Sequence, residues 1–145
     1  MKRFTLIALL LGVLSMGAFA AIGKQPTTFK KLPKSVQNSF KQDLKPEDII
    51  LVTCEKVAPK KYHYELHVSD GTKVLYNTEG QLLRAHNEAG LNEVFVPKEI
   101  NKYLKKNFPN ATVTWYERTV ARQVVELNDK MELIFSRSGK FIRIN

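Results

Sequence analysis

Three side chains that could bind a metal ion alternate along one segment: His63, Glu65 and His67. The run from Tyr62 to Val68 alternates apolar and polar residues, which is typical of a strand with one buried face, so the three share its solvent side. One ion cannot comfortably take both histidines, because a strand places positions four apart about 13 Å from each other. A solvated polar face is the favoured interpretation. A site joining Glu65 to one histidine and a neighbouring strand is the weak alternative, and no cofactor is predicted.

Cys54, paired with His63 or His86, is the only conceivable combination of nucleophile and base. Cys54 ends the apolar run 49–54, which favours burial as a small apolar residue. The sequence has no Gly-x-Ser-x-Gly, no His-Glu-x-x-His and no glycine-rich phosphate loop. We therefore predict that the chain is not an enzyme. As the lone cysteine, Cys54 also excludes an internal disulfide.

The first twenty residues have the composition of a signal peptide. Lys2 and Arg3 precede an apolar stretch over 4–14, and Ala18-Phe19-Ala20 fits the small-x-small cleavage pattern. We predict cleavage after Ala20, a mature chain of 21–145 and no stable membrane anchor afterwards. An uncleaved anchor over 4–22 is the alternative, weakened by the glycines and serine inside that span.

The charge of the chain is strongly basic. The formal net charge of +9 falls to +7 once Lys2 and Arg3 are removed. The remaining lysines and arginines are spread along the sequence without an aromatic-rich RNA signature, and export separates the chain from nucleic acid. We therefore expect attraction to anionic surfaces in general rather than nucleic-acid binding.

The chain contains an internal repeat. Residues 32–36 (LPKSV) reappear 64 positions later as 96–100 (VPKEI), and 73–80 aligns with 132–139 at an offset of 59. The five-residue difference falls between the helix and the later strands, where loop length costs little. Such a unit cannot bury its apolar face alone, which favours a scaffold. The predicted boundaries are about 29–85 for repeat one, 86–94 for an exposed link and about 95–145 for repeat two.

Each repeat reads as a short helix followed by strands. Proline opens both helices, at Pro33 and Pro97, and apolar residues then recur every four positions. β-rich runs follow, with a tight turn at Asp70-Gly71. The second copy has Lys130 where Gly71 stands in the first, so its turn is expected to be looser. These features predict an α+β fold in which two tandem repeats form one long, curved antiparallel sheet with both helices on one face.

In this order, the motifs resemble the PepSY-like, beta-lactamase-inhibitor-like domain family of exported proteins from Gram-negative bacteria. The matching segments are 32–36, 64–72, 107–111 and 139–144. The resemblance covers about 29–145 and implies an eight-stranded concave sheet, a periplasmic location and no known catalytic residues. The inhibitors among these proteins grip an enzyme with that concavity, but none of their contact residues aligns here. Inhibition of a beta-lactamase is therefore an analogy of fold alone.

Alternation along the predicted strands places large apolar side chains on the face away from the helices. If Val74, Tyr76, Leu133 and Phe135 point at the helices, their neighbours must point outward. One of the adjacent residues Trp115 and Tyr116 also faces outward, and the sequence does not say which. The candidate partner-binding residues are Leu75, Leu83, Val124, Ile134, Ile142, Trp115 and Tyr116.

An apolar patch of this size marks either a partner surface or a surface covered by another part of the chain or by a second copy. The leading hypothesis is an exported, non-enzymatic module that binds a protein or peptide and inhibits or modulates an exported enzyme. The alternative is a periplasmic carrier of a small ligand, a metal or an anionic lipid. The sequence leaves the partner's identity open, and the edge strands of the sheet leave a homodimer open.

Overall fold

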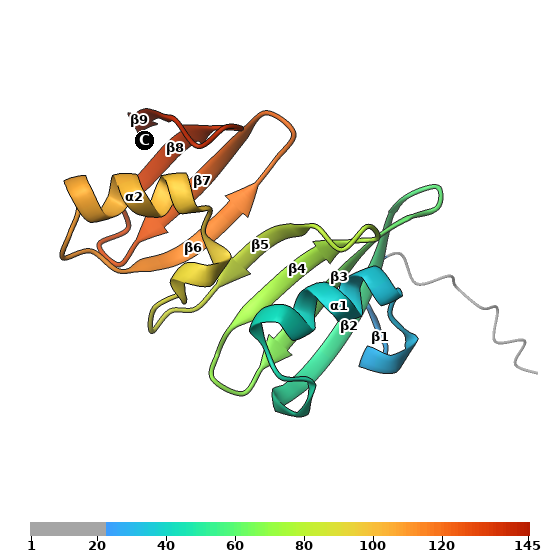
Figure 1. The fold of residues 1–145 in the computed structure, drawn as a ribbon. Helices are drawn as coiled ribbons and strands as arrows, with labels where there is room; N and C mark the ends of the chain where they lie inside the picture. Colours follow the sequence, from blue (N-terminus) through green and yellow to red (C-terminus); the bar gives the residue numbers. More distant parts are fainter. Residues whose placement is uncertain (1–22) are drawn as a thin grey trace, which may run out of the picture.

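A computed structural model describes residues 23–145 as one antiparallel sheet of nine strands in sequence order, covered on one face by two helices (Figure 1). The predicted signal peptide and its cleavage after Ala20 lie outside these residues. The helices are α1 (Lys34–Asp43) and α2 (Lys98–Asn107). The strands are β1 (Gln25–Pro26), β2 (Ile49–Ala58), β3 (Lys61–Val68), β4 (Lys73–Asn77), β5 (Leu82–His86), β6 (Val113–Arg118), β7 (Arg122–Leu127), β8 (Glu132–Ser136) and β9 (Phe141–Ile144).

The predicted α+β fold is confirmed, with one strand more than the family resemblance implied. The extra strand is β1, two residues that pair with Thr53 and Cys54 of β2. After β1, Phe29 opens a 3-10 turn, η1 (Phe29–Lys31), which precedes α1. Two further 3-10 turns, η2 (Pro46–Asp48) and η3 (Glu93–Phe95), lead into β2 and α2.

Both helices begin with the same device. Pro33 and Pro97 occupy the N-cap positions with nearly equal backbone angles, so each helix starts one residue after its proline. One turn later, the Gln37 side chain donates to the carbonyl of Leu32 over 2.8 Å, and the Asn101 side chain donates to that of Val96 over 2.9 Å. These bonds hold each helix against the segment that enters it, and they stand 64 positions apart, as the repeat does.

The core lies between the helices and one face of the sheet. As predicted, Val74, Tyr76, Leu133 and Phe135 point toward the helices and are buried. Val36 and Phe40 of α1, and Ile100 and Leu104 of α2, join them in a single hydrophobic cluster that spans both repeats. Figure 1 shows α1 over the first half of the sheet and α2 over the second. Each amphipathic helix is stabilised by this packing, because ten residues alone form a marginal helix.

The connector 86–94 is more buried than the sequence suggested. Asn87 is buried and donates to Thr72 over 3.0 Å, and Leu91 packs into the core cluster. Chain direction reverses here so that β6 returns antiparallel beside β5, which aligns Arg84 with Glu117, Ala85 with Tyr116 and His86 with Trp115. The other residues of the link are exposed or half-buried, so the expectation of an exposed link holds except at Asn87 and Leu91, which anchor it where the two repeats join.

The turn at Lys130 is as tight as its counterpart at Gly71, contrary to expectation. Lys130 adopts the left-handed conformation with a φ of 68°. Its amide donates to the carbonyl of Leu127 over 2.9 Å, as the amide of Gly71 donates to that of Val68 over 3.0 Å. An aspartate supports each turn, because Asp70 and Asp129 both accept from the amide two residues later. Lysine therefore bears the left-handed backbone at a local cost of about 1 kcal/mol.

Gly80 and Gly139 occupy equivalent turns, but only at Gly80 would an added Cβ clash with backbone. A Cβ at Gly80 would lie 2.6 Å from the carbonyl oxygen of Ser35 in α1, and its φ is +79°. A Cβ at Gly139 would lie 3.1 Å from the Glu99 side chain at a φ of +86°. The Ser39 hydroxyl donates to the Gly80 carbonyl over 2.7 Å, which fixes the close approach.

We expect Gly80→Ala to lower the free energy of unfolding by at least about 2 kcal/mol, because both φ and the backbone contact oppose a methyl group. Gly139→Ala should cost about 1 kcal/mol, mainly from its φ. Urea unfolding followed by far-UV circular dichroism measures both. Equal losses for the two variants would contradict this account of the α1 contact.

Candidate functional site

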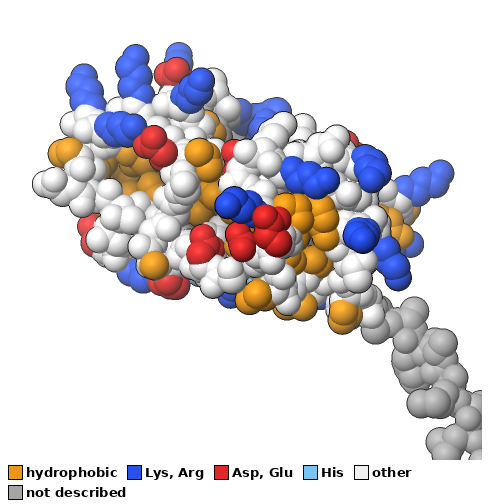
Figure 2. Space-filling model, turned by 60° about the horizontal axis from the view of Figure 1, so that its bottom comes forward, with side chains coloured by type: hydrophobic (Ala, Val, Ile, Leu, Met, Phe, Trp, Pro, Cys, Tyr) orange, Lys and Arg blue, Asp and Glu red, His pale blue; other side chains and the backbone are white. Residues whose placement is uncertain are grey.

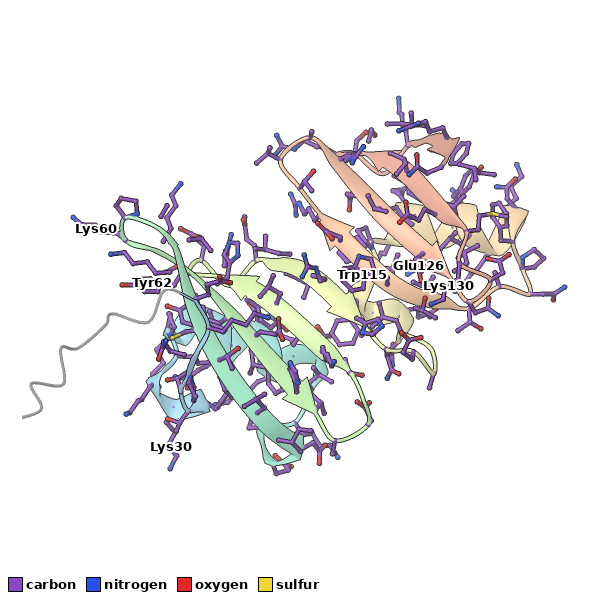
Figure 3. The ribbon with its side chains drawn as sticks, turned by 180° about the vertical axis from the view of Figure 1, so that it is seen from behind. Lys30, Lys60, Tyr62, Trp115, Glu126 and Lys130 are labelled. Atoms are coloured by element: carbon purple, nitrogen blue, oxygen red, sulfur yellow. The ribbon has the colours of Figure 1, made fainter. Side chains whose placement is uncertain are left out.

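The open face is the side of the sheet turned away from α1 and α2, and Figure 3 shows it in front of the helices. Of the residues predicted here, Trp115, Leu75 and Val124 are half-buried and lie on this side. Trp115 lies where the two halves of the sheet meet. The register explains its direction, because Trp115 pairs with His86, whereas the buried Ala85 pairs with Tyr116.

Leu83 and Ile142 reach the surface for a reason that simple alternation misses. Both stand at irregularities of the ladder, Leu83 between Leu82 and Arg84 and Ile142 in the equivalent position of β9. An extra residue in one strand is left unpaired and turns the strand locally. Leu83 is half-buried, whereas Ile142 is 55% exposed at the edge of the sheet.

Two predicted contact residues require correction. Tyr116 belongs to the core, where its hydroxyl donates to Oε1 of Gln123 over 2.7 Å, so it leaves the candidate set. Burial raises the pKa of the Tyr116 hydroxyl, and Arg118 offsets part of that shift. Ile134 borders the open face but is only 3% exposed. Its cross-strand neighbours are Val124 and Arg143. Ile134 therefore lies at the bottom of the hollow on the open face, where little of its side chain is available for contact with a partner.

The Trp115 ring packs against an arginine and a histidine side chain. The Arg84 guanidinium lies 4.9 Å from the centre of the Trp115 ring, and the His86 ring lies 5.3 Å away. Nε of Arg84 is also 3.4 Å from a carboxylate oxygen of Glu117, yet it makes no hydrogen bond there. The Arg84 guanidinium therefore lies over the Trp115 ring and forms only a weak ion pair with Glu117.

A hollow of about 240 Å³ adjoins this group. Leu75 lines its floor, and Lys73, Arg84, His86 and Trp115 surround it. Glu65 also lines the hollow, but its two oxygens face the partners described next. The hollow thus combines apolar floor, an aromatic ring and positive charge, and both repeats contribute to it.

His63, Glu65 and His67 do not converge on a metal site. Nε2 of His67 lies 2.6 Å from Oε1 of Glu65, and Nζ of Lys24 lies 2.6 Å from Oε2. His63 instead lines separate hollows near Val120. Between residues 23 and 145, no group of three or more His, Cys, Asp and Glu side chains is placed to hold an ion.

Neither His63 nor His86 is placed to act as a base for Cys54. Cys54 pairs with Tyr64 across β2 and β3, on the helix side, whereas His63 points to the open face. His86 lies on β5, with β3 and β4 between it and Cys54. Neither pair of nucleophile and base proposed from the sequence is assembled.

The open face is mixed in charge, where the sequence had suggested an apolar patch. Three glutamates, Glu117, Glu126 and Glu132, line one hollow with Val124 and Ile134. Figure 2, taken from another side, shows the same kind of surface, with small groups of hydrophobic side chains between basic and acidic ones. Period-two alternation identified which residues face outward. Alternation could not show which residues of the adjacent strands lie beside them, because that depends on strand register. Most of these neighbours are charged.

The fold and this face define a tandem-repeat, α+β scaffold. The family described as "Putative beta-lactamase-inhibitor-like, PepSY-like" matches residues 21–84 and 86–143. The chain belongs to this family, which confirms the resemblance seen in the sequence. Among curated proteins, none matches the chain.

Three solved structures from Bacteroides share the fold. A protein of Bacteroides thetaiotaomicron, described as "a putative calcium-regulated periplasmic protein", is 25% identical, with a TM-score of 0.73 over 84% of this chain and 96% of that one. Two proteins of Bacteroides vulgatus, both described as putative periplasmic proteins, are 21% identical. Their TM-scores are 0.74 over 85% of this chain and 99% of that one, and 0.75 over 86% and 98%. Across residues 23–145, no helix has the length and apolar character needed to span a bilayer.

Glu65 gives the structure a testable dependence on pH. Burial raises the pKa of its carboxyl, but the hydrogen bonds from His67 and Lys24 outweigh burial and leave the pKa below its ordinary value of 4.5. A carboxyl with a lowered pKa stabilises the fold above its unfolded pKa, and that contribution is lost as the pH falls through the folded value.

We expect wild type to lose more stability between pH 6 and pH 3 than Glu65→Gln, by less than about 1 kcal/mol because the pair is partly exposed. Urea unfolding at the two pH values measures this difference. Glu79→Gln, at an exposed carboxyl without an ion pair among residues 23–145, is the matched control and should follow wild type. Identical pH profiles for wild type and Glu65→Gln would contradict the assigned hydrogen bonds.

Proposed function

We propose that the chain is an exported, non-enzymatic binding module that recognises a protein or peptide partner through the open face. Membership of the PepSY-like family supports a non-catalytic role, and the structural neighbours are described as periplasmic. A basic, apolar and small-residue N-terminal segment supports export to the same compartment.

The observation that carries this proposal is the position of Trp115. It is the single tryptophan of the chain, and it lies half-buried at the junction of the two repeats. Tryptophan and arginine are over-represented among the residues that dominate binding energy, particularly near the centre of an interface. Trp115 and Arg84 form such a pair, and charged side chains surround them as a polar rim surrounds an interface centre.

A protein or peptide fits this face better than the alternative of a small-ligand carrier. The two hollows that Trp115 lines, of about 240 and 350 Å³, lie at the lower end of the range of ligand pockets, roughly 300–1,000 Å³. Metal transport would need a donor set, and the oxygens of Glu65 already face Lys24 and His67. Regulation by calcium is said of one structural neighbour, and the carboxylates that line hollows here do not gather into a group of three that could hold an ion.

The partner we propose is an exported enzyme whose activity the module inhibits or modulates. The family description supports an inhibitor-like scaffold. Which enzyme is bound depends on side chains of the open face rather than on the fold, since one fold carries many functions.

The test compares matched substitutions on opposite faces. Val124→Asp places a charge on the open face, and Val94→Asp makes the same change at a valine that is 56% exposed beside α2. In capture from periplasmic extract of the native host, Val124→Asp and Trp115→Ala should each retain roughly tenfold less partner than wild type, as loss of an interface hot spot does. Val94→Asp should retain wild-type levels.

Thermal unfolding of all three variants separates lost binding from lost folding. Undiminished capture by folded Trp115→Ala and Val124→Asp would refute the assignment of the open face. With the captured partner purified, Trp115 emission should shift to shorter wavelength on binding, since the partner would remove water from the only indole in the chain.

A further inference from the structure

A second concave region lies where β5 and β6 diverge. Their pairing stops at Arg84 and Glu117, and the strand ends beyond those residues separate. Two hollows of about 360 and 270 Å³ open there and share four lining residues, so they form one continuous depression. We name it the basic groove and define it by His63, Leu83, Arg118, Val120 and Arg137.

Both repeats are required to form the basic groove. His63 and Leu83 come from the first half of the sheet. Arg118 ends β6, Val120 lies in the β6–β7 hairpin and Arg137 follows β8. Neither repeat alone holds both the cationic and the opposing side of the groove, so it is a property of the fused sheet.

The cations of the basic groove lack acidic partners. Arg118, Arg137 and the bordering Lys61 make no ion pair or side-chain hydrogen bond with any residue from 23 to 145. Unpaired cations are common between residues 23 and 145, where the ion pairs of lysine and arginine involve Lys24, Arg84, Lys105 and Lys130. The groove differs from the rest of the surface because two unpaired guanidinium groups line the same hollow. Glu79 is the only carboxylate lining either hollow. Two guanidinium groups in one hollow without a carboxylate between them favour an anionic occupant.

The basic groove also offers apolar contact. Leu83 is half-buried on its floor, Val57 is 45% exposed at its border and Val120 is 88% exposed at a hairpin tip. The amide side chains of Asn77 and Gln81 also line the larger hollow, where that of Asn77 donates to that of Gln81 over 2.9 Å. An extended polypeptide that alternates carboxylates with apolar side chains matches this mixture, because successive residues of an extended chain point to opposite sides.

We infer that the basic groove binds an acidic segment of the partner, with carboxylates on Arg118 and Arg137 and an apolar side chain on Leu83 and Val120. This inference rests on the proposed function, because it gives the chemistry of the same partner. Guanidinium groups present planar pairs of donors that match a carboxylate. The charges also steer an acidic partner toward the neighbouring Trp115, and salt weakens that attraction.

The experiment uses a defined probe and the mature chain, 21–145. The probe is a capped, fluorescein-labelled decapeptide that alternates glutamate with valine, and the control probe has glutamine in place of glutamate. Fluorescence anisotropy at 50 mM NaCl should show binding of the glutamate probe, at least fivefold tighter than the glutamine probe. Binding should weaken at 300 mM NaCl, since salt screens exposed charges.

The decisive comparison is between two doubly substituted proteins of equal net charge. Arg118→Gln with Arg137→Gln should weaken the glutamate probe at least fivefold. Lys102→Gln with Lys106→Gln removes the same charge from α2, on the opposite face, and should change the affinity less than twofold. Equal weakening by the two proteins would overturn the inference, because only the net charge would then matter.

Two further outcomes would also overturn it. One is the absence of probe binding by wild type. The other is arginine-dependent binding of phosphatidylglycerol vesicles without binding of the peptide, which would assign the groove to a lipid headgroup. Failure here is distinguishable from failure of the proposed function, because loss of capture by Trp115→Ala does not depend on this probe.

Discussion

Three residue pairs between β5 and β6 join the two repeats into one sheet. The middle pair, Ala85 with Tyr116, is buried under the helices, and the outer pair of His86 with Trp115 lies on the open face. The connector strengthens the junction, since the amide of Leu91 donates to the carbonyl of Val113 over 2.7 Å. The same few pairs unite the core and bring Arg84 and Trp115 together. Both the candidate site and the basic groove therefore exist only when the repeats fold against each other.

The two repeats make equivalent contacts on the helix side of the sheet but carry different residues on the open face. Gln37 and Asn101 hold the helices, and Gly80 and Gly139 provide the turns beneath them. The outer sides differ, with histidine and lysine on the first copy and Trp115 among glutamates on the second. A duplicated scaffold with two different outer halves can present an asymmetric surface, as recognition of a protein partner requires.

Local patterns in the sequence predicted the elements and which face each strand buries. Proline followed by apolar residues every four positions located both helices, and alternation placed Val74 and Phe135 in the core. Which of Trp115 and Tyr116 faces outward depends on the pairing of β6 with β5, and no local sequence pattern specifies that pairing. The burial of Ile134 and the tight turn at Lys130 also depend on neighbouring strands and hydrogen bonds. The basic groove was not predicted, because its residues come from four separate segments of the chain.

We expect the two repeats to unfold as a single cooperative unit, because the β5–β6 junction joins them into one sheet and one core. Native-state hydrogen exchange measured by mass spectrometry tests it most directly, with peptides from β3–β4 compared with peptides from β7–β8. One shared core predicts that the slowest amides of both regions exchange with the same opening free energy and the same dependence on urea. If one repeat exchanged through a separate, lower-energy opening while the other stayed protected, the single-unit account would be contradicted.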